Sequence, residues 1–314
     1  MNQTPTFKSV VDLMAKLKSD SDCRHCLKQI IWNSSGPSGC PRCGSTTFYT
    51  FKDGNTYKCA GCKQKFNLLT GTIFENTKLP LNKWIACIWM ATSYKRGISS
   101  YQVARNLGVT QKTAWFMMQR IRKLFEQLKV TQFEGTCTAD ETFVGGKNLN
   151  RHADKKYDYK GKDYRKTKFP DKISVFGLME VGGKVMSMAV PDVRMSTLQP
   201  LLVKHLKKKS TLMTDEHHGY QYAGHFFTHK KCNHTAGEYV GKDGATTNPI
   251  ENYWSHVKRA VIGTYYKMTP KHIDRYLNEF DFKFNYRDLS DNDKFKLVLS
   301  NAHNTRLKYQ QLIQ

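Results

Sequence analysis

The chain has 314 residues and carries 50 Lys plus Arg against 26 Asp plus Glu, a formal net charge of +24 at pH 7. An apolar content of 39% excludes global disorder, and no apolar run approaches the ~20 residues of a membrane-spanning helix. The length predicts two or three domains, and the charge predicts a polyanionic partner, most simply DNA or RNA. The N-terminus lacks the apolar core of a secretory signal, so we expect an intracellular protein.

Residues 1–35 form a predicted N-terminal helical segment. Apolar residues recur there at a spacing that puts them on one packed side, namely Val10, Leu13, Leu17, Leu27, Ile30 and Ile31. Cys23 and Cys26 lie three residues apart in this helical pattern, and the favoured interpretation is that both face the core. The alternative is that His25 joins them in a second metal site.

Residues 36–75 contain two C-x-x-C pairs with metal-ligand spacing. Cys40, Cys43, Cys59 and Cys62 follow the pattern C-x2-C-x15-C-x2-C. The intervening residues alternate aromatic and polar side chains around Asp53-Gly54, which predicts a hairpin. We therefore predict a zinc ribbon with a structural Zn²⁺ whose four ligands leave no catalytic vacancy. Buried free thiols are the weaker alternative.

Residues 78–129 are predicted to hold a helix-turn-helix DNA-binding region. Ser99 or Ser100 can cap a first helix, Gly108 supplies the turn and Thr110 can cap a second helix. The second helix of such motifs enters the major groove with its first turn toward the bases. The candidate DNA contacts are Gln111, Lys112 and Thr113, with Gln119 also expected to face outward. A three-helix unit that does not bind DNA is the alternative.

Residues 133–290 change to short strands that precede or alternate with helices, which predicts an α/β catalytic domain. The expected strands are TCTAD, ISVFGLME, KVMSMAV, TLMTD and HFFTH. An insertion at 147–172 holds ten Lys or Arg interleaved with aromatic residues. It is either a mobile solvated loop or a DNA-binding segment, in which case its candidate contacts include Lys155, Lys156, Arg165 and Lys166. Residues 291–314 are expected to form a C-terminal tail.

Three carboxylates stand out in this basic chain. Asp140 ends one expected strand and Asp215 ends another, so neighbouring strands would place both side chains together. Glu251 follows the helix-start signal Asn248-Pro249. Acids gathered in this way need a counter-ion, and a divalent cation with oxygen ligands is the natural one. Three unrelated surface acids are the alternative, and Glu141 and Glu216, which alternate to the opposite strand face, are second choices.

The helix after Asn248-Pro249 supplies further candidates. Glu251, Trp254, Ser255 and Lys258 fall on one face, so Lys258 is a candidate phosphate-gripping cation beside the glutamate. The adjacent face, which includes Asn252, His256 and Arg259, suits contacts with a DNA backbone. Among the histidines near Asp215, His217 or His218 is a candidate for positioning water or phosphate. A zinc site at His229, Cys232 and His234 is disfavoured because no fourth ligand stands out.

The order of these motifs resembles the insertion-sequence DDE transposases of the zinc-ribbon group, and the eukaryotic Merlin transposases are similar. The resemblance covers about residues 20–290 and rests on the zinc ribbon, the helix-turn-helix, ADETFVGGK, TDEHHGY and TTNPIENYWSHVKR. It implies an RNase H-like (integrase-type) catalytic fold with Asp140, Asp215 and Glu251 as the metal-binding triad and Lys258 as the basic residue that follows. Some relatives have asparagine in third position, and Asn252 is adjacent here, but the helical face favours Glu251.

The same resemblance implies an activity and partners. The expected enzyme binds the terminal inverted repeats of a mobile element, cleaves a strand and joins it to target DNA, using two Mg²⁺ ions (or Mn²⁺). Pairing of two element ends implies a homodimer or larger assembly on DNA. Two alternatives remain: a DNA-binding regulator whose catalytic domain is inactive, and an RNase H-type nuclease that cuts without joining.

Overall fold

The computed structural model describes residues 5–33, 35–145, 172–232, 244 and 246–313. The chain divides into two compact units, of which unit 1 combines residues 1–128 with 286–314 and unit 2 comprises residues 129–285. The predicted insertion at 147–172, with Lys155, Lys156, Arg165 and Lys166, lies outside the described residues except for Lys172, as does His234. Within the described ranges, no helix is both long and apolar enough to cross a membrane.

Unit 1 is built around helix α3 (Leu81–Ser93), most of whose residues are buried. Five other helices contact α3, namely α1 (Val10–Lys16), α2 (Asp20–Ile31), α4 (Ser100–Leu107), α5 (Gln111–Glu126) and α9 (Asp291–Ser300). The short helix α10 (Gln310–Ile313) follows near the end of the chain. A separate small antiparallel sheet has the order β1 (Phe48–Thr50), β2 (Thr56–Cys59), β3 (Lys65–Asn67). The predicted N-terminal helical segment thus consists of two helices, α1 and α2. Leu13, Leu17 and Leu27 of this segment are buried, as predicted.

Helices α4 and α5 begin where the sequence predicts. Ser99 caps α4, and the α4–α5 turn passes through Gly108 at a φ of 58°, a conformation that glycine adopts without strain. Thr110 caps α5 by accepting a hydrogen bond from the backbone of Thr113. The outward orientation expected for Gln119 is wrong, because its side chain is 0% exposed. Helix α5 contacts α3, α4 and α9, so more than one of its sides is covered.

Residues 286–314 belong to unit 1 and do not form a separate tail. Phe295 of α9 packs edge-on against Phe7, with ring centroids 5.8 Å apart, and against Trp89 at 5.4 Å. The Arg120 side chain of α5 donates a hydrogen bond from Nε to the carbonyl oxygen of Leu307 at 3.0 Å. The expected catalytic domain therefore ends earlier, at residue 285, and the last part of the chain completes the unit that carries the N-terminal helices.

Unit 2 contains a mixed five-stranded sheet with the order β6-β5-β4-β7-β8. Its strands are β4 (Thr136–Val144), β5 (Ile173–Glu180), β6 (Val185–Val190), β7 (Thr211–Thr214) and β8 (Thr228–Lys231). Strands β4, β5 and β6 pair antiparallel, whereas β7 runs parallel to both β4 and β8. Two predicted bounds are wrong: β4 continues past Asp140 to Val144, and the HFFTH strand begins only at Thr228, after a 3-10 turn at Ala223–His225.

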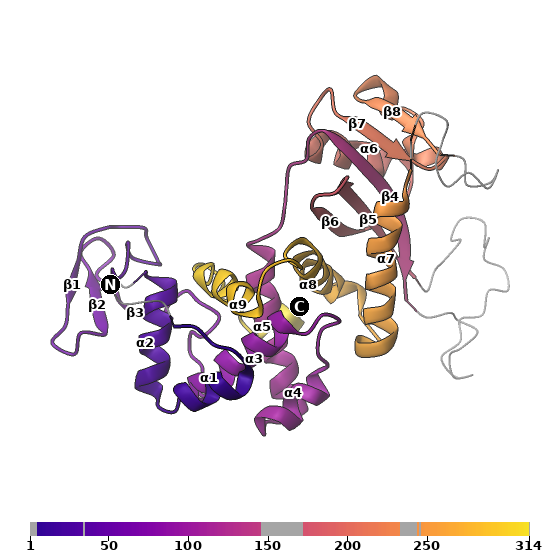
Figure 1. Cartoon of the computed structure of the whole chain (residues 1–314). Helices are drawn as coiled ribbons and strands as arrows, with labels where there is room; N and C mark the ends of the chain where they lie inside the picture. Colours follow the sequence, from indigo (N-terminus) through magenta and orange to yellow (C-terminus); the bar gives the residue numbers. More distant parts are fainter. Residues whose placement is uncertain (1–4, 34, 146–171, 233–243, 245, 314) are drawn as a thin grey trace. The chain divides into compact units, whose positions relative to one another are not determined.

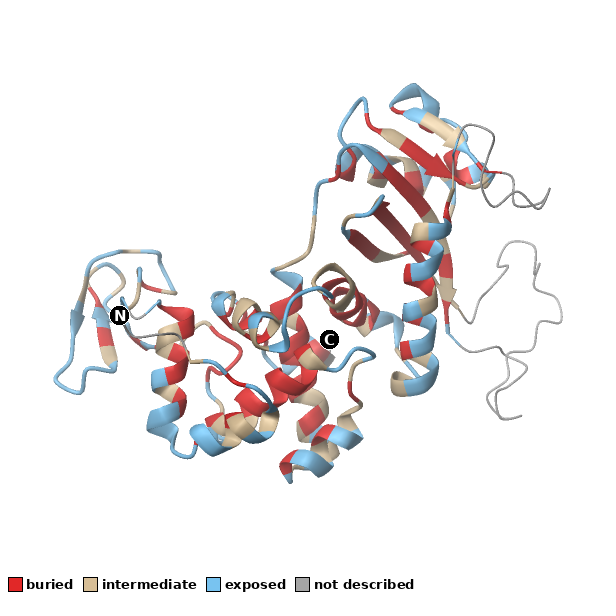
Figure 2. Ribbon diagram, in the orientation of Figure 1, coloured by how far each residue is buried: buried red, intermediate tan, exposed pale blue. Residues whose placement is uncertain are grey.

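Helices cover both faces of this sheet, as an α/β layer requires (Figure 1). On one face Val175 and Met179 of β5 pack with α7 (Asn248–Ala260) and α8 (Ile273–Asn285). On the other face Phe176 and Leu178 pack with α6 (Met195–His205) and the 3-10 turn η3 (His218–Tyr220). Figure 2 shows that the strands are largely buried while α7 presents an exposed outer side. Leu277 and Phe280 of α8 are buried in the core on the first of these faces.

Candidate active site and zinc site

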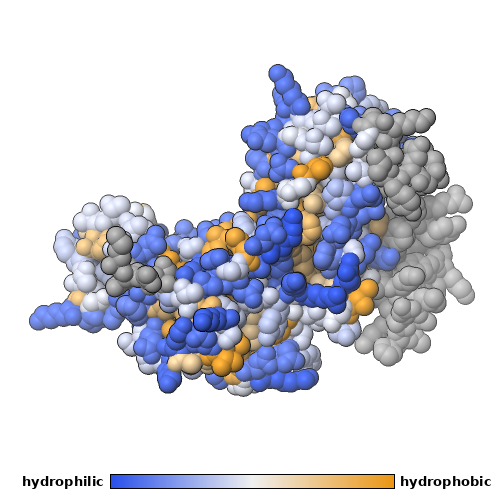
Figure 3. All heavy atoms as spheres, in the orientation of Figure 1, coloured by the Kyte–Doolittle hydropathy of each residue, from blue (hydrophilic) through white to orange (hydrophobic). Residues whose placement is uncertain are grey.

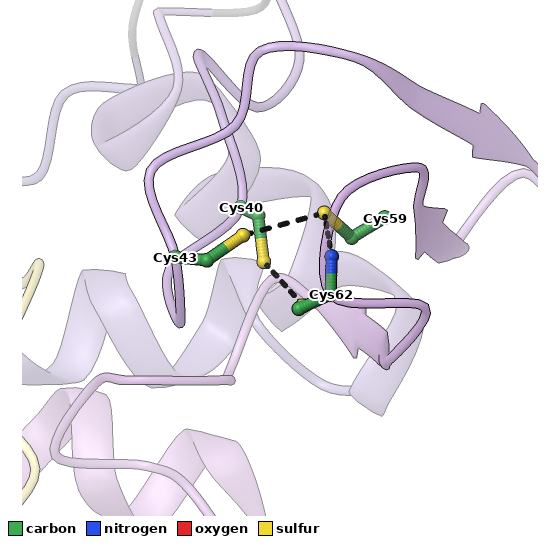
Figure 4. A group of neighbouring side chains, drawn as sticks. All are labelled: Cys40, Cys43, Cys59 and Cys62. Atoms are coloured by element: carbon green, nitrogen blue, oxygen red, sulfur yellow. Dashed lines mark hydrogen bonds between the residues drawn. The ribbon is translucent and has the colours of Figure 1, made fainter.

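The four predicted zinc ligands converge at the base of the small sheet (Figure 4). Cys59 ends β2, and the sulfur atoms approach in pairs, with Cys40 Sγ 3.7 Å from Cys62 Sγ and Cys43 Sγ 3.5 Å from Cys59 Sγ. All four lie within 4.8 Å of one another. A tetrahedral zinc ion with Zn–S distances of about 2.3 Å separates its sulfurs by about 3.8 Å. The observed cluster fits that geometry.

Local hydrogen bonding favours the thiolate of one cysteine of this cluster. The backbone N–H of Cys62 donates to Cys59 Sγ at 3.4 Å, and this bond is the main reason that the pKa of Cys59 falls, while the neighbouring sulfurs raise the pKa of Cys62. The thiolate is the form that binds metal. On α2, burial raises the pKa of Cys23 to about 11 and that of Cys26 to about 12. Both are buried in the core, which confirms the favoured interpretation of this pair.

The two aspartates come from adjacent parallel strands, as predicted. The last paired residues of β4 and β7 are Thr138 and Met213, and each aspartate lies two residues further along its strand direction. Asp140 is the more constrained of the two. Burial raises its pKa to about 7, and the charges of Glu141 and Asp215 add to that effect. The site therefore concentrates negative charge at one place in a strongly basic protein.

Helix α7 meets the sheet at Asp140. Trp254 of α7 donates a hydrogen bond from its indole Nε1 to Asp140 Oδ2 at 3.0 Å. Glu251 lies one turn earlier on the same helix, is exposed, and accepts a hydrogen bond from Thr247 Oγ1 at 2.7 Å. Lys258 is exposed further along the helix, as is Arg259, which donates to the backbone oxygen of Ser255 at 3.2 Å.

The three carboxylates have the donor chemistry of a divalent-cation site, but their oxygens are not gathered as the cysteine sulfurs are. Within the described part of the chain, the cysteines are the only group of three or more such ligand atoms that lie within 4.8 Å of one another. Hard cations such as Mg²⁺ bind carboxylate oxygens. Burial is the main cause of the raised pKa of Asp140, and the neighbouring negative charges add to it; a bound cation offsets both costs of the ionised form. The residue types and charges of the three acids therefore fit a divalent cation. Glu251, however, accepts a hydrogen bond from Thr247 and is not gathered with the two aspartates.

Glu141 lies on the opposite sheet face, as its position in the strand predicts. Its side chain is 7% exposed and accepts a hydrogen bond from Tyr220 Oη at 2.7 Å. Burial raises its pKa to about 7, and the charge of Asp215 acts in the same direction. His217 Nδ1 lies 3.1 Å from Glu141 Oε1, while the His217 backbone N–H donates to Asp215 Oδ1 at 3.0 Å. His217 thus links Glu141 with Asp215, near the predicted site.

His217 Nδ1 has two close polar neighbours. The backbone N–H of Gly219 donates to it at 3.2 Å, and Glu141 Oε1 lies 3.1 Å away. A carboxylate oxygen and a ring nitrogen at that distance share a proton. By contrast Glu216 and His218 are exposed and join neither acid in any described contact.

Two further groups of residues considered in the sequence lie apart from the acids: the disfavoured zinc site and the candidate DNA contacts of α5. His229 forms a hydrogen bond through Nε2 to Thr214 Oγ1 at 2.9 Å, and neither it nor buried Cys232 belongs to a metal-ligand group in the described ranges. On α5, Lys112 is exposed. Gln111 Nε2 donates to Ser100 Oγ at 2.9 Å, so its side chain is used between the two helices.

Four residues of the site have contacts that sequence reasoning did not assign. These are Gly177, Tyr220, Thr247 and Trp254. A signal existed for Trp254, which falls three residues after Glu251 and so shares its helical face. Tyr220 ends the TDEHHGY motif, but nothing in the motif pairs it with Glu141. No signal existed for Gly177, because its role depends on strand register.

A four-cysteine ribbon precedes a mixed α/β domain in this chain, and both match domains of zinc-ribbon transposases. Residues 132–285 match the ISXO2-like transposase domain, and residues 18–65 match the transposase zinc-ribbon domain. The chain belongs to the ISXO2-like DDE transposases with an N-terminal zinc-ribbon domain. A protein in transposable element ISH50 of Halobacterium salinarum is 27% identical over 241 residues, which cover 74% of this chain and 80% of that protein. A transposase-like protein of Haemophilus influenzae is 28% identical over 107 residues, 34% of this chain and 85% of its own length.

Proposed function

We propose that this transposase binds the terminal inverted repeats of its mobile element and catalyses Mg²⁺-dependent strand cleavage and strand transfer through Asp140, Asp215 and Glu251. One arrangement carries the proposal: Asp140 and Asp215 each lie two residues beyond the last pair of adjacent parallel strands, and the helix that bears Glu251 is bonded to Asp140 through Trp254. The strand order β6-β5-β4-β7-β8, with three antiparallel strands followed by two parallel ones, supports an RNase H-like fold.

Each residue of the proposed triad has a defined task. Two Mg²⁺ ions, or Mn²⁺, would supply the Lewis acid that activates water or a DNA 3′-hydroxyl and stabilises the leaving oxygen. Asp140 and Asp215 supply carboxylate oxygens from the rigid sheet. Glu251 supplies a third carboxylate from α7, for which it exchanges its hydrogen bond with Thr247. Lys258 is exposed two turns further along the helix, where it contacts a phosphate of the bound strand.

DNA recognition is assigned to unit 1 and to basic residues of the catalytic domain. We assign the helix-turn-helix role to α4 and α5, with exposed Lys112 at the start of the second helix. Gln111 and Thr113 contact DNA only if they leave their present partners, Ser100 and Thr110. Hydrophilic residues cover much of the described face seen in Figure 3, between smaller hydrophobic patches. The formal net charge of +24 suits a polyanionic partner. Synapsis of two element ends requires a homodimer or a larger assembly.

The test uses the zinc-loaded full chain with DNA that carries the element ends. The ends are found as inverted repeats, bordered by short direct repeats, in the genomic flanks. Asp140→Asn, Asp215→Asn and Glu251→Gln are each expected to lower cleavage by more than about 100-fold, because loss of a residue one shell outside the ligands already costs about 10- to 100-fold. Glu216→Gln is the matched control, since Glu216 adjoins Asp215 but is exposed.

The outcomes separate the proposal from its rivals. Strand joining to a supercoiled target plasmid supports a transposase, whereas robust cutting without a joined product identifies a nuclease. Sequence-specific binding without Mg²⁺-dependent cutting identifies a regulator. If Asp140→Asn leaves cleavage intact, the assignment of the active site is wrong.

A further inference from the structure

Gly177 of β5 creates the space in which the indole of Trp254 lies. Gly177 is the cross-strand partner of Asp140, so both positions face the same side of the sheet, the side covered by α7. A Cβ atom on Gly177 would lie 2.5 Å from Cζ2 and 2.7 Å from Cη2 of Trp254, and 3.0 Å from Cδ1 of Ile250. Such contacts are too short for carbon atoms, so any larger residue at position 177 displaces the indole.

The indole in that space is aimed at one carboxylate oxygen. Trp254 is 3% exposed, and its Nε1 donates to Asp140 Oδ2 at 3.0 Å. A buried indole N–H needs an acceptor, and here Asp140 supplies it. Because Trp254 lies one turn after Glu251, the same bond joins the helix of the third acid to the strand of the first. The bond therefore ties the carboxylate of Asp140 on β4 to helix α7.

We propose that Trp254 is a positioning residue of the metal site, which holds Asp140 Oδ2 so that Oδ1 is directed to the cation, and that Gly177 is the residue that admits it. The inference rests on the proposed function, since it assigns Asp140 as a ligand. Partners that hydrogen-bond the second oxygen of a metal ligand fix its orientation and raise metal affinity. Trp254 is such a partner and, as an indole, coordinates nothing itself.

The first test measures cation binding without catalysis. In calorimetric titrations of the zinc-loaded full chain with Mn²⁺, Trp254→Phe is expected to weaken binding by about 10- to 100-fold. Phenylalanine retains an aromatic ring in the core but removes the N–H donor. The matched control is Trp84→Phe, because Trp84 is also buried and donates its indole N–H, to Thr77 Oγ1 at 2.8 Å in unit 1. Trp84→Phe is expected to leave Mn²⁺ affinity within about 2-fold.

The second test reports on the bond itself. The chain has five tryptophans, so ¹⁵N-Trp labelling gives five indole N–H signals, of which the one lost in Trp254→Phe is assigned to Trp254. That signal is expected to shift on addition of Mg²⁺, whereas the Trp84 signal is expected to stay in place. If the chemical shift of the Trp254 indole does not change at Mg²⁺ concentrations at which calorimetry shows binding, the proposal is contradicted.

The steric part is tested by a double-mutant cycle. Gly177→Ala is expected to weaken Mn²⁺ binding as strongly as Trp254→Phe does. The double variant is expected to bind no worse than Trp254→Phe alone, because phenylalanine lacks the ring atoms that the new methyl group meets. Circular dichroism checks that each variant is folded. If Gly177→Ala does not fold, the Mn²⁺ affinity of Trp254→Phe alone decides whether Trp254 positions Asp140.

Asp140→Asn distinguishes failure of this inference from failure of the proposed function. If Asp140→Asn abolishes Mn²⁺ binding and cleavage while Trp254→Phe binds Mn²⁺ like the wild type, the triad stands and the positioning role is wrong. If Asp140→Asn binds Mn²⁺ and cleaves like the wild type, the triad assignment itself is wrong, and the inference falls with it.

Discussion

Replacing Asp140 by asparagine is expected to stabilise the fold at the pH at which it inactivates the enzyme. Burial, together with the charges of Glu141 and Asp215, raises the pKa of Asp140 from 3.8 to about 7. Between these values the folded state binds the proton more tightly than the unfolded state, so the free energy of unfolding falls as pH rises. At ~1.4 kcal/mol per pKa unit, ionised Asp140 costs the metal-free fold at most about 4 kcal/mol above pH 7.

The introduced asparagine carries no charge and keeps an oxygen that can accept the Trp254 N–H. We therefore expect Asp140→Asn to raise the free energy of unfolding by about 2 to 4 kcal/mol at pH 8. Near pH 4 the gain is expected to vanish. For a domain of this size, the gain at pH 8 corresponds to an increase of about 5 to 10 °C in Tm.

Differential scanning calorimetry of the zinc-loaded chain, without added Mg²⁺, measures this difference at pH 4.5 and pH 8. Glu216→Gln, which removes an exposed charge next to Asp215, serves as the control and is expected to change Tm by little at either pH. Added Mg²⁺ is expected to raise the Tm of the wild type but not of Asp140→Asn. A variant that is less stable than the wild type at pH 8, or whose effect does not depend on pH, refutes the assignment of a strained, ionised Asp140.

Three further outcomes are expected. Cys59→Ser is expected to lower the zinc content from one ion per chain to none by mass spectrometry, whereas Cys23→Ala, which changes a core cysteine of α2, is expected to retain one ion. Tyr253→Phe removes a buried hydroxyl that donates to Asp281 Oδ1 at 2.6 Å, so urea unfolding is expected to show a loss of about 1 to 3 kcal/mol. Mn²⁺ affinity is expected to rise with pH through about 7, because protons compete for Asp140; calorimetry that finds equal affinity at pH 6 and pH 8 contradicts this reasoning.

The features that the sequence predicted well are those that local chemistry determines. The cysteine spacing and the Asp53-Gly54 turn define the zinc ribbon within about 25 residues. Ser99 and Thr110 mark helix starts through their own side-chain hydrogen bonds, and the structure has both caps. Neighbouring positions for Asp140 and Asp215 followed from two strand-like runs that each end in an acid.

The features that the sequence did not predict depend on pairing between distant segments. Nothing near Gly177 indicates that it lies opposite Asp140, because strand register is a property of the assembled sheet. The burial of Gln119 was not predicted for a similar reason. Helix α5 is covered by α3, α4 and α9, and the periodicity of its own sequence does not show how many neighbours it has. Asp140 was expected at a strand end, yet β4 continues to Val144 because β5 pairs with it along its full length.

The return of residues 286–314 to unit 1 has a consequence for the order in which the protein folds during synthesis. Unit 2 is contiguous in the chain, so all of its residues leave the ribosome before α9 does. Until α9 is synthesised, helix α3 of unit 1 lacks the contact that Phe295 of α9 makes with Trp89. The catalytic domain can therefore be complete while the zinc-ribbon unit is still unfinished. During synthesis, a transposase of this architecture can therefore complete unit 2 before it completes unit 1, the unit assigned to recognising DNA ends.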